Sequence, residues 1–264
     1  MIPSLAAAAL GLALLAAPAG ATTDIAASAD QALATSRAAE GNTIGDHALI
    51  DHRGRPLRLS QFRGRPLVIS MIYTSCHYTC PTMTHTLSNA IEAARKALGS
   101  DSFAVLSVGF DSRVDTPPML SAFARQQGID TDSWPFASGP RETIDRLAKE
   151  IGFTFFVAPR GFDHIAQTTI LDAQGRVYRQ VYGEMFDTPL VVEPLKDLIL
   201  GRAASLTSVD GIVNRVKFFC TVYDPNTGGY RFDYSIFIEF FMGLTSVILV
   251  AIFLIQSLRR RRST

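Results

Sequence analysis

An almost unbroken apolar stretch near the C-terminus sets the strongest limit on what this chain can fold into. Phe240–Ile255 has two hydroxyl residues as its only polar side chains, and Ile236 and Phe237 extend the stretch beyond Glu239. A run of this length can cross a bilayer as a helix, whereas a core helix of a soluble domain rarely lacks a polar face for so many turns. We therefore expect a transmembrane helix over residues 235–258.

The residues on either side of this helix predict its orientation. Arg259–Arg262 follow it directly, and basic residues beside a span stay on the cytoplasmic side. Residues 259–264 are thus expected to form a short cytoplasmic tail. The folded part of the chain then lies on the opposite side of the membrane.

The N-terminus supports the same topology. Ile2–Ala17 is almost wholly small and apolar, and Ala19-Gly20-Ala21 has the small-x-small pattern that precedes signal-peptide cleavage. The stretch carries no Lys or Arg, and an uncleaved anchor is the alternative, but it is shorter than the roughly 20 residues that a span needs. We expect a signal peptide over residues 1–21 and a single-pass protein of the bacterial inner membrane, with its folded domain in the periplasm.

Charge and cysteine content exclude two further classes of protein. Four of the 25 basic residues lie in the tail, so the remaining chain has 21 basic and 24 acidic residues and a net charge of −3. A negative net charge of this kind lacks the excess of basic residues that nucleic-acid binding requires. Three cysteines are too few for a disulfide scaffold, and a chain of 264 residues needs none to form a core.

Between the two ends the sequence predicts a flexible spacer, one folded domain and a juxtamembrane segment, over residues 22–40, 41–204 and 205–234. The spacer is rich in Ala, Ser, Thr and Asp and poor in bulky apolar residues. The domain alternates strand-like and helix-like patterns, and its last part has two strands joined by Asp172-Ala-Gln-Gly175 before a final helix over Pro189–Leu200. This order predicts an α/β thioredoxin-like fold with a central mixed sheet flanked by helices.

Two cysteines lie where a buried strand, Leu67–Tyr73, turns into a helix that ends at Gly99. Cys76 and Cys80 are four residues apart, which is one helical turn, so both sulfurs can face the same side. A helix N-terminus favours the thiolate, which attacks disulfides and binds metal. Inert core cysteines and a permanent structural disulfide are the two alternatives.

Two thiolates suit Cu(I), and an added imidazole gives a site that can also hold Cu(II). Five histidines are available as a third ligand: His47, His52, His77, His85 and His164. His77 points away from its neighbour Cys76 on a helix. His164 precedes a strand expected beside the cysteine turn, but the residues alone leave open whether it is a ligand or an ordinary loop histidine.

The domain resembles the SCO/SenC family, the copper chaperones of cytochrome oxidase assembly, from about Gly41 to Leu200. The resemblance rests on Gly64-Arg-Pro, Tyr73-Thr-Ser-Cys76-His-Tyr-Thr-Cys80-Pro81, Asp111-Ser-Arg-Val-Asp115-Thr-Pro117, Asp163-His164 and Leu171-Asp172-Ala-Gln-Gly175. It implies that Cys76, Cys80 and His164 bind copper.

The resemblance also suggests roles for three acidic residues. Asp111 and Asp115 match positions near the family's metal site, and Asp163 precedes the proposed histidine ligand. An outer-shell or partner-docking role is therefore expected for Asp111, Asp115 and Asp163. For the first two, turn formation and helix capping before Pro117 are an equal alternative.

The chain departs from many family members in its anchor, which lies at the C-terminus rather than at the N-terminus. The segment Phe218–Tyr230 before it has the pattern of an ordered turn and resembles the juxtamembrane stretch of C-terminally anchored relatives. Cys220 within it is either a thiol for the copper site or a partner, or a silent one.

The resemblance implies a metallochaperone, not an enzyme, which carries copper as Cu(I), Cu(II) or both to cytochrome c oxidase and most directly to its CuA centre. Its expected partners are the oxidase subunit that carries the copper acceptor site, a copper donor chaperone, a periplasmic thiol reductant and the membrane. A thiol:disulfide oxidoreductase or peroxidase that uses Cys76 and Cys80 is the rival function. A purely structural assembly tether is a third hypothesis.

Overall fold

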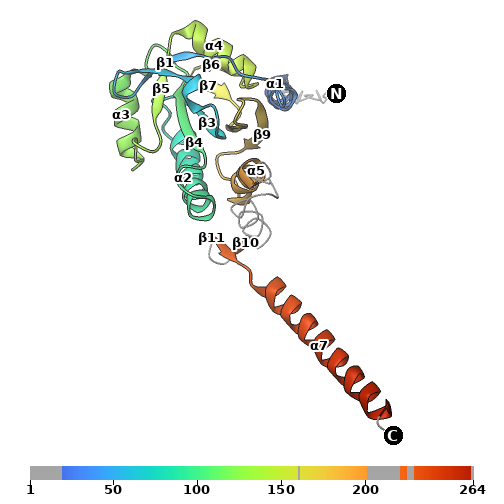
Figure 1. Ribbon diagram of the computed structural model, residues 1–264. Coiled ribbons are helices and arrows are strands. Elements are labelled where there is room, and N and C mark those ends of the chain that lie inside the picture. The colour runs from blue at the N-terminus through green and yellow to red at the C-terminus, as the bar shows by residue number, and fades with distance from the viewer. Residues whose placement is uncertain (1–19, 160, 201–220, 225–228, 263–264) are drawn as a thin grey trace, which may run out of the picture.

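The computed structural model describes residues 20–159, 161–200, 221–224 and 229–262. The main domain has a seven-stranded mixed sheet with helices packed against it (Figure 1), and the strand order is β2-β1-β5-β4-β3-β8-β9. The strands are β1 (Ala48–Asp51), β2 (Pro56–Arg58), β3 (Leu67–Ile72), β4 (Ala104–Gly109), β5 (Phe136–Ser138), β8 (Gln167–Leu171) and β9 (Val177–Tyr182). The predicted mixed sheet with flanking helices is confirmed.

The two central strands, β3 and β4, are parallel and buried at every position. Their continuous runs of aliphatic residues are what a strand covered on both faces requires. β8 pairs with β3 in the antiparallel direction, so Gln167, at the start of β8, lies near the carboxyl end of β3. The carboxyl end of β3 is therefore where the chain brings its cysteine turn and its late histidine to one side of the sheet.

Among the described residues, the helices of the main domain are α1 (Gly20–Ala38), α2 (Thr79–Leu98), α3 (Pro117–Gln126), α4 (Arg141–Glu150) and α5 (Pro189–Leu200), together with the short 3-10 helix η1 (Leu59–Phe62). In α2 the buried side chains recur at helical spacing, including Met83, Leu87, Ile91 and Ala94. Gly99 then ends the helix with φ of +100°, a conformation that favours glycine. α2 and α5 pack against each other.

Helix α1 corrects the predicted flexible spacer over residues 22–40. Its small side chains Ala32 and Ser36, followed by Ala39, are buried against the domain. The Ser36 hydroxyl donates a hydrogen bond of 2.7 Å to Oε1 of buried Gln167. The composition suggested disorder because bulky apolar residues are few, but small residues spaced three and four apart let a helix approach the sheet closely. The predicted signal peptide lies outside the described residues except for Gly20 and Ala21.

Strands β6 (Phe155–Ala158) and β7 (Gly161–His164) form a separate antiparallel hairpin. Within the described parts of the chain these two strands pair only with each other, beside the carboxyl ends of β3 and β4. This β6–β7 hairpin carries His164 at its end.

A second small hairpin joins the domain to the last helix. β10 (Thr221–Asp224) pairs with β11 (Gly229–Phe232), and the Tyr230 hydroxyl donates a hydrogen bond of 2.9 Å to Glu193 on α5. The predicted juxtamembrane segment is thus ordered where it is described, while Cys220 falls outside the described residues. The hairpin lies at the end of the domain away from β6 and β7 (Figure 1).

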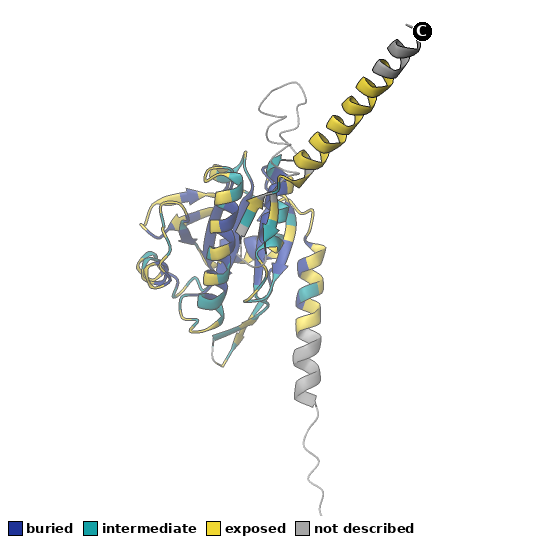
Figure 2. Cartoon of the chain, turned by 90° about the horizontal axis from the view of Figure 1, so that it is seen from below, coloured by how far each residue is buried: buried dark blue, intermediate teal, exposed yellow. Residues whose placement is uncertain are grey.

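Helix α7 (Ser235–Arg262) extends away from the domain, and its described side chains are exposed along its length (Figure 2). Phe237–Ile255 within it is long and apolar enough to cross a membrane, with a mean hydropathy of 2.5. An apolar helix that packs against nothing else in the described chain needs another apolar environment. The sequence prediction of one C-terminal apolar helix is confirmed.

Candidate metal centre

The turn between β3 and α2 presents two thiols of different exposure. Cys76 is half-buried and Cys80, in the first turn of α2, is fully buried. The backbone N–H of Cys80 donates a hydrogen bond of 3.2 Å to the sulfur of Cys76. Both thiols are free. Helix α2 begins at Thr79, so Cys76 lies in the turn before the helix, and the expectation that both cysteines share one helical turn is wrong. The hydrogen bond from the Cys80 N–H to the Cys76 sulfur nevertheless brings the two residues together.

The two thiols differ in acidity because they share one hydrogen bond. The Cys80 thiol donates a hydrogen bond to Cys76, and this bond is the main reason that the pKa of Cys76 falls to about 5. Burial opposes the fall, and the backbone N–H groups of Cys80 and Tyr78 add to it. The same bond to Cys76, then burial and the negative charge of Cys76, raise the pKa of Cys80 far above its usual range. At neutral pH Cys76 is thus a thiolate and Cys80 a protonated thiol.

Asp115 holds this turn against the sheet. Its side chain is buried, and its Oδ1 accepts two hydrogen bonds of 2.7 Å from the N–H and hydroxyl of Thr74. Its Oδ2 accepts a bond of 2.8 Å from the N–H of Asp111. Burial raises the pKa of the Asp115 carboxyl, although these hydrogen bonds oppose the rise. A side chain added at Gly109 would lie 2.6 Å from the Asp115 Cβ, so the glycine makes room for this contact.

His164 stands at the end of β7 among aromatic rings. Its ring centroid lies 5.9 Å from that of Tyr73, 5.4 Å from that of Phe110 and 5.5 Å from that of Phe153. Its Nδ1 is 3.0 Å from the carbonyl oxygen of Ile165. If Nδ1 carries the proton in that contact, Nε2 is left as the nitrogen available to a metal.

The two cysteines and His164 lie at the same end of the sheet but are not assembled into a metal site. Among the described residues no three His, Cys, Asp or Glu side chains are grouped closely enough to hold a metal ion. Tyr73 connects the two parts: its ring contacts His164, and its carbonyl oxygen accepts a hydrogen bond of 3.1 Å from the backbone N–H of Cys76. The structure therefore brings the expected ligands into one neighbourhood without closing them around a common point.

The other histidines lie elsewhere or point to solvent. His77 and His85 are exposed. His47 pairs with Glu150 at 2.6 Å, and buried His52 belongs to the turn after β1.

The other two acidic candidates have different surroundings. Asp111 is mostly buried and accepts a hydrogen bond of 3.3 Å from the N–H of Arg113, a turn contact. Asp163 is exposed beside His164.

A cleft of about 340 Å³ lies on the His164 side of this neighbourhood. Ala29 and Ala32 of α1 form one wall, and residues in and next to the β3–α2 turn and the β6–β7 hairpin form the rest: Tyr73, Thr79, Thr154, Phe156, Phe162, Asp163, His164 and Ile165. Helix α1, which the sequence did not reveal as a helix, is thus part of the surroundings of His164.

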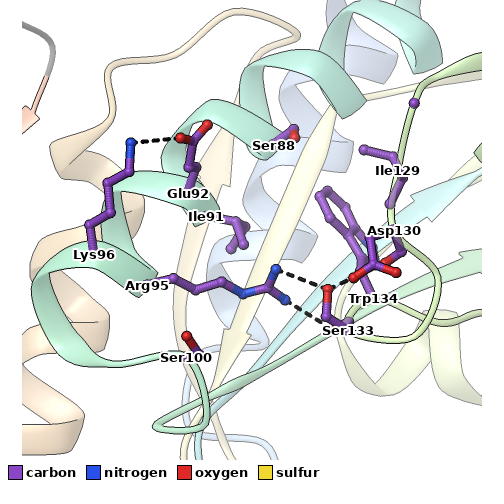
Figure 3. A pocket seen from close by; sticks show the side chains of 11 residues that line it. Ser88, Ile91, Glu92, Arg95, Lys96, Ser100, Ile129, Asp130, Ser133 and Trp134 are labelled. Carbon is purple, nitrogen blue, oxygen red and sulfur yellow. Dashed lines mark hydrogen bonds and ion pairs between the residues drawn. The ribbon is translucent and has the colours of Figure 1, made fainter.

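Another hollow, of about 370 Å³, lies between α2 and the loop around Asp130, away from the cysteines (Figure 3). The Arg95 guanidinium donates to the hydroxyl and carbonyl oxygens of Ser133 at 3.0 and 2.9 Å, and Lys96 pairs with Glu92 at 2.6 Å. Both basic side chains that line this hollow therefore already have partners, Arg95 in Ser133 and Lys96 in Glu92. No metal ligand expected from the sequence lines this hollow.

The sequence did not predict two parts of the structure that lie beside His164, namely Tyr73 and helix α1. In the sequence Tyr73 is the last residue of an apolar strand, and nothing in the pattern shows that its ring packs against His164. Helix α1 lacks the bulky apolar stripe by which an amphipathic helix is usually found. The spacing of Ala32, Ser36 and Ala39 is the one signal that was present.

A model of the SCO1/SenC family matches residues 35–200. A curated relative, the SCO1 protein homolog of Bacillus subtilis (strain 168), is 24% identical over 140 residues, which cover 52% of this chain and 71% of the relative.

Solved structures share the fold. ScoI of Bradyrhizobium japonicum, whose structure has copper bound, aligns with a TM-score of 0.51 at 21% identity, over 58% of this chain and 98% of that one. BsSco aligns with a TM-score of 0.51 at 19% identity, over 60% of this chain and 94% of that one. It is described as a member of the Sco family of cytochrome c oxidase assembly proteins with a disulfide switch. The predicted thioredoxin-like fold is confirmed by these alignments.

Proposed function

The chain belongs to the SCO1/SenC family, and on that premise we propose that it binds copper through Cys76, Cys80 and His164 and delivers it to cytochrome c oxidase during assembly. ScoI of Bradyrhizobium japonicum has copper bound, and BsSco is placed among oxidase assembly proteins. The CuA centre of the oxidase is the proposed acceptor.

The observation that carries this proposal is the unequal pair of thiols beside an imidazole. Cys76 is a half-exposed thiolate, the form that captures a soft cation, and Cys80 lies behind it. Because the pKa of Cys80 is raised, binding a metal to both sulfurs releases the Cys80 proton. Copper held in this way needs no covalent chemistry from the protein, so the proposed role is transport rather than catalysis.

The third ligand comes from the β6–β7 hairpin. His164 lies within ring contact of Tyr73, and β6 and β7 form a hairpin of their own beside the main sheet. We propose that a small shift of this hairpin brings the imidazole onto copper already held by the thiols. Asp115 fixes the cysteine turn during that shift, while exposed Asp163 is available to a docking partner.

The location that the sequence predicts also belongs to this proposal. The chain is a single-pass protein of the bacterial inner membrane, held by α7, with its domain in the periplasm and its C-terminus in the cytoplasm. An exported thiol pair is exposed to oxidation, and a disulfide cannot give two thiolates to copper. A periplasmic thiol reductant and a copper donor chaperone are therefore proposed partners.

A thiol:disulfide oxidoreductase is the second candidate function, and one observation favours it. A low-pKa, accessible Cys76 with a buried partner is also the arrangement that attacks disulfides. Against it, three residues separate the cysteines, and the imidazole nearby has no part in exchange between two sulfurs.

A copper titration of the reduced full-length protein in detergent micelles separates the two functions. We expect one Cu(I) per chain, bound in competition with a chromophoric chelator, and a sulfur-to-Cu(II) charge-transfer band when Cu(II) is used. The Cys76→Ala, Cys80→Ala double variant should lose both signals. A His77→Ala, His85→Ala variant, which removes two exposed imidazoles, is the matched control and should keep them. No copper binding by the reduced wild-type protein, together with rapid turnover of disulfide substrates, would establish the oxidoreductase instead.

A further inference from the structure

Three hydroxyl side chains in the core have no hydrogen-bond partner within the described part of the chain. They belong to Ser70 on β3, Thr84 on α2 and Thr168 on β8, and each of these residues is at most 1% exposed. Buried polar groups in native proteins are almost always hydrogen-bonded, to protein or to ordered water, because an unpaired group costs the free energy of its lost hydration. Three such hydroxyls in one core therefore indicate a shared cause.

Two of the three hydroxyls lie next to each other on the sheet. Ser70 and Thr168 are register partners on the antiparallel strands β3 and β8. Directly opposed residues point to the same face of a sheet, with their Cβ atoms roughly 5 Å apart. Gln167, the neighbour of Thr168, points to the other face, where it accepts the hydrogen bond from Ser36 of α1. Ser70 and Thr168 thus face away from α1.

The face that carries Ser70 and Thr168 is the one that α2 covers. Ser107 on β4 is the register partner of Ser70 in the parallel direction and shares its face. The indole N–H of Trp134 donates a hydrogen bond of 3.0 Å to the Ser107 hydroxyl. Trp134 in turn lines a hollow together with Ile91 of α2 (Figure 3). The two unpaired hydroxyls on the sheet therefore point toward α2.

The third hydroxyl comes from the buried side of α2. Thr82 and Thr86 donate their hydroxyl hydrogens to carbonyl oxygens of their own helix, at 2.9 and 3.0 Å. Thr84 lies between them on the buried side, with Cys80 one turn earlier, and its hydroxyl makes no such bond. It is therefore available to a group between the helix and the sheet.

Thr84 and Ser70 lie at comparable depths below the cysteine turn. Strand β3 runs toward that turn and α2 runs away from it. Three residues of strand place Ser70 roughly 10 Å from Tyr73, and five residues of helix place Thr84 roughly 7.5 Å from Thr79. The three hydroxyls therefore converge between β3, β8 and the start of α2.

We propose that Ser70, Thr84 and Thr168 bind one internal water molecule between the sheet and α2, one helical turn from Cys80. A buried water makes about three hydrogen bonds, and each hydroxyl can donate or accept one. The water satisfies all three groups and links the start of α2 to the sheet. This inference concerns the core of the domain and does not depend on the proposed copper binding.

Replacing a hydroxyl by a methyl group distinguishes a hydrated site from a dry one. In the full-length protein in detergent micelles, Thr84→Val and Thr168→Val should each lower the equilibrium constant for folding about tenfold, because the water and the other hydroxyls lose a partner. In a dry site both changes would raise it, since an unpaired buried hydroxyl is removed. Thr82→Val, which loses only a bond within its own helix, is the matched control and should change the constant less than about threefold.

Combined substitutions test whether the hydroxyls share one water. The Thr84→Val, Thr168→Val variant should lose clearly less than the product of the two single losses, because the second change acts on a site that is already disrupted. Adding Ser70→Ala should recover stability relative to this double variant, since no unpaired hydroxyl is then left. Losses that multiply, with no recovery in the triple variant, would overturn the shared water.

The water itself can be detected in solution. Magnetic relaxation dispersion of the oxygen nuclei of isotope-labelled water counts the molecules that stay inside a protein for longer than it tumbles. The wild type should hold about one more such water than the triple variant. Equal counts in the two proteins, or a gain in stability in either single valine variant, would overturn the proposal.

Discussion

The two parts of the proposed copper site are attached to the fold in different ways. The cysteine turn joins a fully buried central strand to α2, and the buried carboxylate of Asp115 fixes it through two hydrogen bonds from Thr74. In the β6–β7 hairpin, which carries His164, the two strands pair only with each other among the described residues. The hairpin packs against the domain through aromatic rings, including those of Tyr73 and Phe110. One part is built into the core, and the other is held beside it.

This difference separates stability from metal capture. Changes in the cysteine turn disturb buried hydrogen bonds and therefore affect both the free energy of unfolding and copper binding. Changes in the hairpin affect contacts at the edge of the domain and therefore act mainly on copper. A carrier that must also release its metal benefits from having one ligand on a part that can move.

The largest expected effect is on the fixed part. Asp115→Ala removes three hydrogen bonds to a buried carboxylate and should lower the free energy of unfolding by about 3 kcal/mol. Chemical denaturation of the full-length protein in detergent, followed by circular dichroism, measures this loss. Asp163→Ala, at an exposed carboxylate on the hairpin, is the control and should change stability by less than about 0.5 kcal/mol. Equal losses in both variants would remove the distinction between the two parts.

The fold and the cysteine turn could be predicted from the sequence because their signals are local. A buried aliphatic run, a helical repeat and a helix-ending glycine place Cys76 and Cys80 without any knowledge of distant contacts. The location of His164 needed the family resemblance, because its position depends on a hairpin that packs through rings far apart in the chain. For Asp115 the sequence left a role near the metal and a turn or cap role equally open. That its side chain reaches back 41 residues to Thr74 follows only from the fold.

Removing the imidazole should weaken copper binding with little cost in stability. His164→Ala is expected to lower copper affinity by at least roughly 10- to 100-fold, the range already seen when groups that only support a ligand are lost. The free energy of unfolding should fall by about 1 kcal/mol, since the half-buried ring gives up its aromatic contacts. Competition with a Cu(I) chelator measures the affinity, and His77→Ala supplies an exposed imidazole as control. An affinity equal to that of the wild type would show that His164 is not a ligand.

The acidity of Cys76 gives a third comparison, this time within the fixed part. With a pKa of about 5, Cys76 remains a thiolate from pH 8 down to pH 6 and loses its charge only as pH falls through 5. Its rate of alkylation by iodoacetamide should therefore change less than about twofold between pH 8 and pH 6, whereas an ordinary thiol slows roughly 100-fold.

Cys80→Ala tests the cause of this acidity. The Cys80 thiol is the main donor to Cys76, so its loss should move the alkylation midpoint of Cys76 to higher pH. A midpoint that stays near pH 5 in this variant would assign the acidity to the backbone N–H groups of Tyr78 and residue 80 instead.

The smallest expected effect concerns helix α1, which forms one wall of the cleft beside His164 and which the composition of residues 22–40 did not reveal. Ser36→Ala removes the hydroxyl that donates to Gln167, so it should lower the free energy of unfolding by about 1 kcal/mol. Hydrogen exchange should increase in α1 and in the β6–β7 hairpin but not in the cysteine turn, because the hydrogen bonds from Thr74 to Asp115 fix that turn independently of α1. Thr35→Ala is the control, since the Thr35 hydroxyl bonds within its own helix to the carbonyl of Gln31. If exchange rose equally around Cys76, α1 would have to be counted as support for both parts, and the contrast between a fixed thiol pair and a movable imidazole would lose its structural basis.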